Sequence, residues 1–312
     1  MTTMTNKSKR MADYGFTLTE LAVVMVIVAL LIGGLLLPLA AQEDLRKVRA
    51  TESTLYEVRD ALLGFAAANG RLPCPASLSS NGKEEFCTEA PSTAPTPADQ
   101  SCTPTPMSAY ASHGRCSHPY DGYVPAAVLG LQPINDKGLL VDAWNEPIRF
   151  AVATDQLSGT ETPPFAYAFT GASGMKKQGL TNLKPDLAVC STASKAGYSV
   201  LNPGASGATC PKDDIHSIDF ALISNAAAVI YSLGANSHRR TSDPNFLDGK
   251  EGGTGADEKH NPNANTAVPN DRVFISHEPA PKEAANGEFD DIVIWLSPNI
   301  LYSRMIAAGR LP

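Results

Sequence analysis

The sequence lacks the short motifs that identify many enzymes and metal-binding proteins. Its six cysteines form no CxxC pair, which argues against a thioredoxin-like or zinc-ribbon site. It contains neither the G-x-S-x-G motif of many hydrolases nor a Gly-Lys-Ser/Thr phosphate loop. Adjacent acids, such as Asp213-Asp214 and Asp290-Asp291, do not show two carboxylates facing across a cleft. We therefore expect no catalytic residues and no enzyme, with a membrane-tethered enzyme as the weakest alternative.

The chain also contains fewer basic than acidic residues. The 312 residues include 25 Lys and Arg against 32 Asp and Glu, which gives a net charge of −7 at pH 7. An acidic chain without a basic stripe is not expected to bind nucleic acid. The length is sufficient for one large domain or two ordinary ones with a substantial core.

A long apolar run is present near the N-terminus, where Leu21 to Ala41 contains no charged residue. Its length suits a helix that spans a bilayer, and the preceding Lys7, Lys9 and Arg10 favour a cytoplasmic N-terminus. An ordinary signal anchor is the alternative. Glu20 lies immediately before the run. An acidic side chain in a membrane helix raises the free energy of insertion unless it pairs with a cation.

The residues Gly15-Phe16-Thr17-Leu18-Thr19-Glu20-Leu21, with the apolar run behind them, resemble the N-terminus of type IV pilins and type II secretion pseudopilins. The resemblance implies that a prepilin peptidase cleaves after Gly15 and that the new terminal residue, Phe16, is N-methylated. It also implies that Glu20 serves assembly by pairing with the Phe16 amine of a neighbouring subunit. Pro38 stands near the position where helices of this family bend.

The same resemblance divides the chain into three parts. Residues 1–15 are expected to be a leader peptide. Residues 16–70 are expected to form a long helix, of which 16–41 is the transmembrane segment and filament core. Residues 71–312 are expected to form a periplasmic or extracellular globular head.

Helical periodicity continues beyond the apolar run. Apolar residues recur at spacings of three, four and seven and form one stripe that is expected to pack on the head, with a coiled-coil stalk as the alternative. Asn69-Gly70 is typical of a helix end, and Pro73 and Pro75 prevent the helix from resuming. The stripe consists of Leu45, Val48, Leu55, Val58, Leu62 and Phe65.

Short strand patterns follow, separated by loops rich in Gly, Pro and Asn. Strands are expected within 148–153, 165–171 and 289–297, while 217–234 is either a strand or a short buried helix. These elements predict an α+β domain, in which the long N-terminal helix packs on a mainly antiparallel sheet with large loop insertions. By resemblance, this arrangement is the pilin fold.

The even number of cysteines favours disulfides if the head lies outside the cytoplasm. Sequence alone does not select their connectivity, although Cys190–Cys210 is the favoured pair. The loop 76–120 is either a disulfide-held insertion without a ligand or the display surface of an adhesin. Two further disulfides are expected among Cys74, Cys87, Cys102 and Cys116.

Short head segments are similar to the major pseudopilin of type II secretion, in which the loop between the last two motifs binds calcium. The resemblance implies calcium ligands at the carbonyl of Leu233 and the side chains of Asn236 and Asp290, with Asp248 or Asp257 as further acids. A solvated acidic loop is the alternative, and no cofactor other than calcium is expected. The matching residues are Asp142, Trp144 and Pro147, then Ser232-Leu233-Gly234-Ala235, then Asp291-Ile292 with Trp295.

Together these patterns predict a minor or specialised structural subunit of a type IV pilus or a type II secretion filament. Its expected partners are homologous subunits, a prepilin peptidase, the membrane and an inner-membrane assembly platform. The subunit is expected to cross the inner membrane once and then to enter a periplasmic pseudopilus or a cell-surface pilus. A pilus-associated adhesin that binds a surface or a glycan through 76–120 is the alternative function.

Overall fold

The computed structural model contains two compact units, Met1–Arg46 and Lys47–Pro312. Backbone structure is described for 17–87, 104–105, 113–155, 157, 166–195, 198–199, 210, 212–213, 218–237, 255–261 and 272–312. Within these ranges, the side chains of 32–41, 104–105, 194–195, 198–199, 212–213, 218–219 and 259 are not described.

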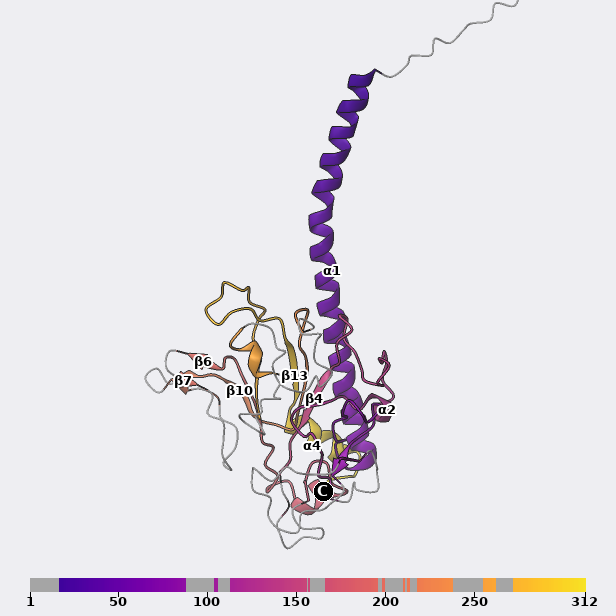
Figure 1. Ribbon diagram of the computed structural model, residues 1–312. Coiled ribbons are helices and arrows are strands. Elements are labelled where there is room, and N and C mark those ends of the chain that lie inside the picture. The colour runs from indigo at the N-terminus through magenta and orange to yellow at the C-terminus, as the bar shows by residue number, and fades with distance from the viewer. Residues whose placement is uncertain are drawn as a thin grey trace, which may run out of the picture. The chain divides into compact units, whose positions relative to one another are not determined.

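Helix α1 (Leu18–Asn69) is a continuous helix of 52 residues (Figure 1). In the first unit, every side chain from Leu18 to Leu31 is exposed. Among the described residues, no helix combines the length and hydropathy of a membrane span. Pro38 lies inside α1, and the bend expected there stays a prediction.

In the second unit, α1 buries the part of the predicted stripe that lies there. Leu55, Val58 and Leu62 are completely buried, but Leu45 is 57% exposed. Packing begins with Thr51, whose Oγ1 accepts a hydrogen bond of 3.2 Å from the backbone N–H of Ala143. Leu45, at the upstream end of the predicted stripe, belongs to the first unit, so its packing on the head stays a prediction.

The end of α1 agrees with the Asn69-Gly70 signal. Gly70 has φ of 73° and donates its N–H to the carbonyl of Ala66 at 2.8 Å, which is a helix-terminating geometry that favours glycine. Arg310 supplies a second cap from the far end of the chain, because its guanidinium donates to the carbonyls of Ala67 and Ala68.

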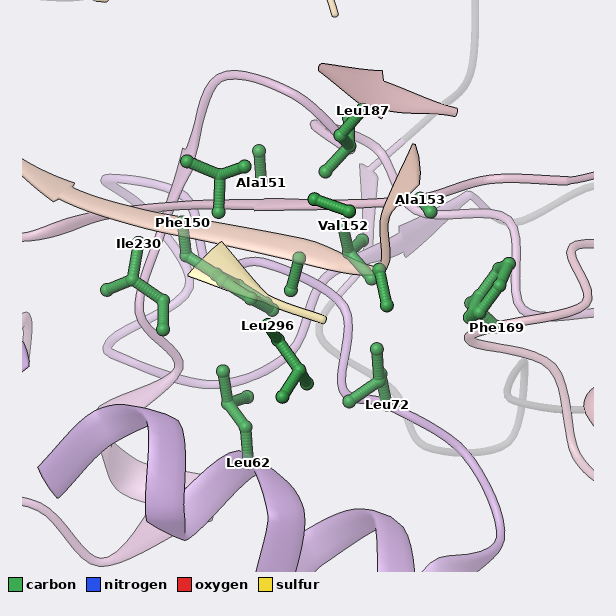
Figure 2. Close-up of a cluster of buried hydrophobic side chains, with 14 of the residues drawn as sticks. Leu62, Leu72, Phe150, Ala151, Val152, Ala153, Phe169, Leu187, Ile230 and Leu296 are labelled. Atoms are coloured by element: carbon green, nitrogen blue, oxygen red, sulfur yellow. The ribbon is translucent and has the colours of Figure 1, made fainter. Parts of the chain in front are cut away.

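A four-stranded antiparallel sheet packs against α1. Its order is β13 (Ile292–Leu296), β11 (Ala228–Ser232), β4 (Arg149–Val152) and β3 (Gly122–Tyr123). Figure 2 shows Leu62 of α1 pointing toward Leu296, close to Phe150 and Ile230. Since these side chains are completely buried, the hydrophobic core lies between the helix and this sheet.

A second, three-stranded sheet has the order β10 (Ala221–Ala226), β5 (Leu187–Cys190) and β12 (Val273–Ile275). β10 is antiparallel to β5, whereas β12 is parallel to it. Only Ala227 separates β10 from β11, so the chain passes directly from one sheet into the other. The described part of the ambiguous segment 217–234 is therefore mainly extended, and its central alanines, Ala226, Ala227 and Ala228, are completely buried.

The remaining elements are short and connect these layers. The helices are α2 (Ala126–Leu129), α3 (Gly174–Gln178), the 3₁₀ turn η2 (Glu258–His260) and α4 (Pro298–Ala307). The paired strands are β1 (Phe86–Cys87) with β2 (Pro104–Thr105), β6 (Ser194–Lys195) with β7 (Tyr198–Ser199), and β8 (Lys212–Asp213) with β9 (Ile218–Asp219).

Two local expectations need correction, and one helix was not expected. The described part of 165–171 contains a turn and a single bridge residue, Tyr167, and no extended strand. β4 does not alternate between buried and exposed residues, because Arg149 is as buried as Phe150. Helix α4 was not predicted, although Ser297 followed by Pro298 is an ordinary start signal.

Two disulfides lie within the described residues. Cys190 pairs with Cys210, the favoured pair, with an S–S distance of 2.02 Å. Cys74 pairs with Cys116 across 42 residues. Cys87 is disulfide-bonded as well, and Cys102 lies outside the described residues. The architecture is thus a mixed α+β arrangement whose sheets are mainly antiparallel.

Candidate cation site and processing segment

The predicted cleavage residues, Gly15 and Phe16, lie outside the described residues, which begin at Thr17. Thr17 and Glu20 form a reciprocal pair at the start of α1. The backbone N–H and the hydroxyl of Thr17 donate to Glu20 Oε2 at 2.9 and 2.8 Å, and the N–H of Glu20 donates to Thr17 Oγ1 at 3.3 Å. This is the capping-box arrangement, which the T-x-x-E spacing would have predicted.

Glu20 therefore has a partner within its own chain, which the sequence reasoning missed. Both residues are exposed to solvent. A carboxylate has about four lone-pair sites, so this contact leaves capacity for a further donor. The cap holds the carboxylate beside the first helical turn, close in sequence to the predicted cleavage point.

In the head, motifs that are distant in the sequence come into contact. Asp142 Oδ1 accepts hydrogen bonds from the N–H groups of Trp144 and Glu146, both at 2.9 Å, which closes the turn before β4. Its other oxygen, Oδ2, accepts from Ser232 Oγ at 2.5 Å. The first head motif is therefore joined to the end of β11, where the second motif begins.

Gly234 shapes the loop that follows β11. Its φ is +67°, and a Cβ added there would lie 2.5 Å from Asp290 Oδ1. The close approach lets Asp290 Oδ2 accept from the N–H groups of Ala235 and Asn236, at 2.9 and 3.2 Å. The loop after β11 is thereby fastened to the residues that lead into β13.

Three carboxylates meet at this junction. Glu258, Asp290 and Asp291 place one oxygen each within 4.8 Å of one another. Glu258 is completely buried and Asp291 is 5% exposed. Asn236 Nδ2 donates to Glu258 Oε1 at 2.7 Å, and the N–H of Asp290 donates to the same oxygen at 3.1 Å. These four residues are called the carboxylate cluster below.

Each member of the carboxylate cluster also has a buried oxygen without a hydrogen-bond partner among the described residues. These atoms are Asn236 Oδ1, Glu258 Oε2, Asp290 Oδ1 and Asp291 Oδ1. Buried polar atoms are nearly always satisfied in folded proteins, and leaving one unpaired costs roughly 1–3 kcal/mol. Four such oxygens in one cluster are therefore consistent with a site for a cation.

The electrostatics favour the same conclusion. Burial, reinforced by the neighbouring carboxylate of Glu258, raises the pKa of Asp290 to about 7. Burial and the neighbouring charges of Glu258 and Asp290 also raise the pKa of Asp291 well above its ordinary value. The buried guanidinium of Arg149 offsets part of this effect on Asp291. One such cation does not balance three carboxylates, so a divalent ion would stabilise their ionised forms.

The donor set consists of oxygens alone. Carboxylate, amide and carbonyl oxygens suit hard cations such as Ca²⁺, whereas zinc sites usually include nitrogen or sulfur. The residues therefore fit calcium. They fit the alternative of a solvated acidic loop poorly, since Asn236, Glu258 and Asp291 are buried.

The fold brings together some of the calcium ligands that the sequence predicted. Asn236 and Asp290 meet in the cluster, and Leu233 is buried at the start of the same loop. Asp248 lies outside the described residues. Asp257 binds elsewhere, because its carboxylate accepts hydrogen bonds from Ala193, Thr192 and Asn286.

Sequence reasoning missed two members of the cluster. Asp291 could have been predicted as a ligand, because it is adjacent to Asp290 directly before a strand. No local sequence pattern identifies Glu258, because it lies within a long polar insertion that resembles a loop. The spatial proximity of Glu258 depends on the way 255–261 packs back onto both sheets.

Comparison with known families identifies the N-terminal segment. Residues 10–36 match the family model described as the prokaryotic N-terminal methylation motif. The chain thus carries the prepilin-type signal of type IV pilins and pseudopilins. Comparison with curated proteins gives no match, and comparison with solved structures gives none either.

This motif has direct consequences for the class of protein. It supports a pilin-like substrate of prepilin peptidase, made as a membrane-anchored precursor that assembles with other pilin subunits. Proteins with this signal usually have a structural role.

Proposed function

We propose that the chain is a structural subunit, minor or specialised, of a type IV pilus or a type II secretion filament. The observation that supports this proposal is the methylation motif at 10–36, which overlaps a helix with apolar side chains exposed on all its faces. A helix with a single apolar stripe packs on one partner, whereas one that is apolar all round needs burial on every side. Lipid and neighbouring subunits supply such surroundings in turn.

The proposed life cycle follows the predicted division of the chain. Residues 1–15 are removed, 16–41 hold the subunit in the inner membrane and later form the filament core, and 71–312 form a head with a pilin-type fold. The assembly platform extracts the subunit from the membrane. The filament is then a periplasmic pseudopilus or a cell-surface pilus.

Glu20 has a defined task in this scheme. The Thr17 cap orients its carboxylate at the first helical turn, four residues along the sequence from the amine that cleavage creates on Phe16. In the filament, that carboxylate pairs with the Phe16 amine of a neighbouring subunit and sets the axial register. Glu20 therefore contributes to assembly and not to catalysis.

The test uses cells that produce the full chain together with its peptidase and assembly platform. Purified fibres are imaged, and their subunits are analysed by mass spectrometry for a mature N-terminus at N-methyl-Phe16. Glu20→Ala is expected to abolish fibres while processing continues. Glu43→Ala removes an exposed acid from the same helix and serves as the matched control. Fibres of normal number from Glu20→Ala would refute the assigned role of this residue.

We propose in addition that the carboxylate cluster binds one calcium ion. Asn236, Glu258, Asp290 and Asp291 would hold the ion through the four oxygens that lack partners, and the carbonyl of Leu233 stays a predicted ligand. The ion supplies positive charge that stabilises three buried carboxylates. Extracellular calcium modules bind with dissociation constants of about 10⁻⁴–10⁻³ M, and we expect a value in that range.

Calcium binding is measured by calorimetric titration of the full chain in detergent. Asp291→Asn is expected to weaken binding by about tenfold or more, because affinity follows the charge of the ligands. Asp60→Asn, which changes an exposed acid on α1, is the control and should bind as the unaltered chain does. Absence of a calcium signal up to 10 times the upper end of the expected range, roughly 10⁻² M, would exclude the site.

The adhesin alternative has less support. The described parts of 76–120 are largely buried and are fastened by the Cys74–Cys116 disulfide. These parts therefore have a structural role. Binding of the full chain to cells or glycans that is lost when 88–112 is shortened would favour the alternative.

A further inference from the structure

The segment 255–261 contacts three separate regions of the head through three of its side chains. Asp257 is directed to the segment that follows β5, where its carboxylate accepts from the N–H of Ala193 at 2.6 Å and from Thr192 Oγ1 at 3.1 Å. Glu258 belongs to the carboxylate cluster. Asn261 is directed to β12. The described part of this insertion is thus held at both of its ends and at the cluster between them.

Asn261 makes the connection most directly. Its Nδ2 donates to the carbonyl of Ile275 at 2.9 Å, and its Oδ1 accepts from the N–H of the same residue at 2.7 Å. The side-chain amide therefore pairs with β12 as a neighbouring strand would. Nδ2 also donates to Asp291 Oδ2 at 2.6 Å. A single completely buried amide thus joins the carboxylate cluster to the edge of the three-stranded sheet.

The two sheets meet the cluster from different sides. Asn236 follows β11 and Asp291 precedes β13, so both belong to the four-stranded sheet. Asn261 contacts β12 of the other sheet, and Asp257 contacts Thr192 and Ala193 in the segment that follows β5 of that sheet. Without a cation, the three carboxylates of the cluster repel one another and weaken the attachment of 255–261. With a cation, the same groups attract a shared centre and hold the segment in place.

We propose that residues 255–261 form a cation-controlled clasp between the two sheets, in which Asn261 is the positioning residue that couples the carboxylate cluster to β12. This inference rests on the calcium site proposed above. A clasp whose calcium affinity is that of an extracellular module closes where calcium is abundant. Residues 255–261 therefore become attached to both sheets after the head leaves the cytoplasm. The clasp thereby makes the rigidity of the three-stranded sheet depend on the calcium concentration of the compartment.

Hydrogen–deuterium exchange of the full chain in detergent tests the clasp. Exchange is compared in EGTA and in CaCl₂ at 100 times the measured dissociation constant. A ligand that binds only the closed state reduces opening by a factor of about 100 under that condition. We expect exchange to slow by about that factor at Ala193 and Ile275, whose N–H groups are held by the clasp.

Two variants separate coupling from simple structural support. Asn261→Ala should remove the calcium-dependent slowing at Ile275 and preserve it at Ala193, whereas Asp257→Asn should have the reverse effect. Asn182→Ala, which removes an exposed amide that donates to a backbone carbonyl, is the control for both. A residue with only a structural role would speed exchange equally with and without calcium, and the ratio of the two rates would not change.

The results distinguish the clasp from the calcium site on which it rests. If the unaltered chain binds calcium but exchange at Ala193 and Ile275 is the same in both buffers, the clasp is refuted and the calcium site stands. If the chain binds no calcium, both are refuted. If either variant fails to fold, the other still tests the coupling at its own contact.

Discussion

Gly234→Ala tests how closely the loop after β11 approaches Asp290. Gly234 has φ of +67°, and the added methyl would lie 2.5 Å from Asp290 Oδ1 and from its carbonyl oxygen. These contacts are shorter than side-chain carbons tolerate, and the atoms concerned belong to the backbone and to a hydrogen-bonded carboxylate. The methyl should therefore displace Asp290 from the cluster.

The magnitude has two parts. A left-handed conformation costs an L-residue roughly 1–2 kcal/mol, and overpacking costs roughly 1–3 kcal/mol more. The free energy of unfolding should therefore fall by about 2–5 kcal/mol. Gly130→Ala isolates the first part, because Gly130 has φ of +70° and no heavy atom within 4 Å of the added methyl. That control should lose only about 1–2 kcal/mol.

Urea denaturation of the full chain, with and without calcium, measures both variants. Calcium at 100 times its dissociation constant should stabilise the unaltered chain and Gly130→Ala by about 2.7 kcal/mol. Gly234→Ala should gain much less, because Asp290 no longer reaches the ion. Equal losses for Gly234→Ala and Gly130→Ala, with equal gains from calcium, would refute the close contact.

Three further substitutions test other parts of the head. Burial raises the pKa of Asp155 from 3.8 to about 6, so its favourable contribution is present below pH 3.8 and is lost as pH rises through 6. Asp155→Asn should consequently raise Tm at pH 8 by roughly 2–4 °C, after allowance for partial exposure, and leave it unchanged at pH 3.5. Glu84→Gln breaks a buried bidentate pair with Arg71, whose two hydrogen bonds measure 2.6 and 2.9 Å. The free energy of unfolding, measured by guanidinium denaturation, should therefore fall by about 3–5 kcal/mol. A loss under about 1 kcal/mol would contradict the pairing. Arg310→Ala removes the cap on α1 and should lose about 1 kcal/mol in the same assay, whereas the control Arg304→Ala should change little.

Local signals predicted the elements whose formation depends on nearby residues. α1 ends at Asn69 because Gly70 readily adopts a positive φ, and β11 and β13 form where β-branched and aromatic residues together are the majority. The same kind of signal was present for α4 and was overlooked. Thr17 was overlooked in the same way, although its spacing from Glu20 is that of a capping box.

Other features depended on contacts between distant residues. Within the second unit, Leu55 is completely buried by tertiary partners, which helical periodicity does not identify. Arg149 occupies a polar position in a strand pattern, yet it is buried because the surrounding core contains acids and aromatic rings. No local pattern distinguishes these cases, because burial is decided by packing.

The sequence by itself determined the class of the protein. The methylation motif, the apolar run and the helix end depend on the order of neighbouring residues, and a peptidase or a membrane recognises that order directly. Only the tertiary structure brought together all the residues of the proposed cation site and the proposed clasp. Glu258 and Asn261 lie in an insertion without local signals, and the functions proposed for them depend on its folding back onto β11, β12 and β13, which brings buried oxygens together from three parts of the chain.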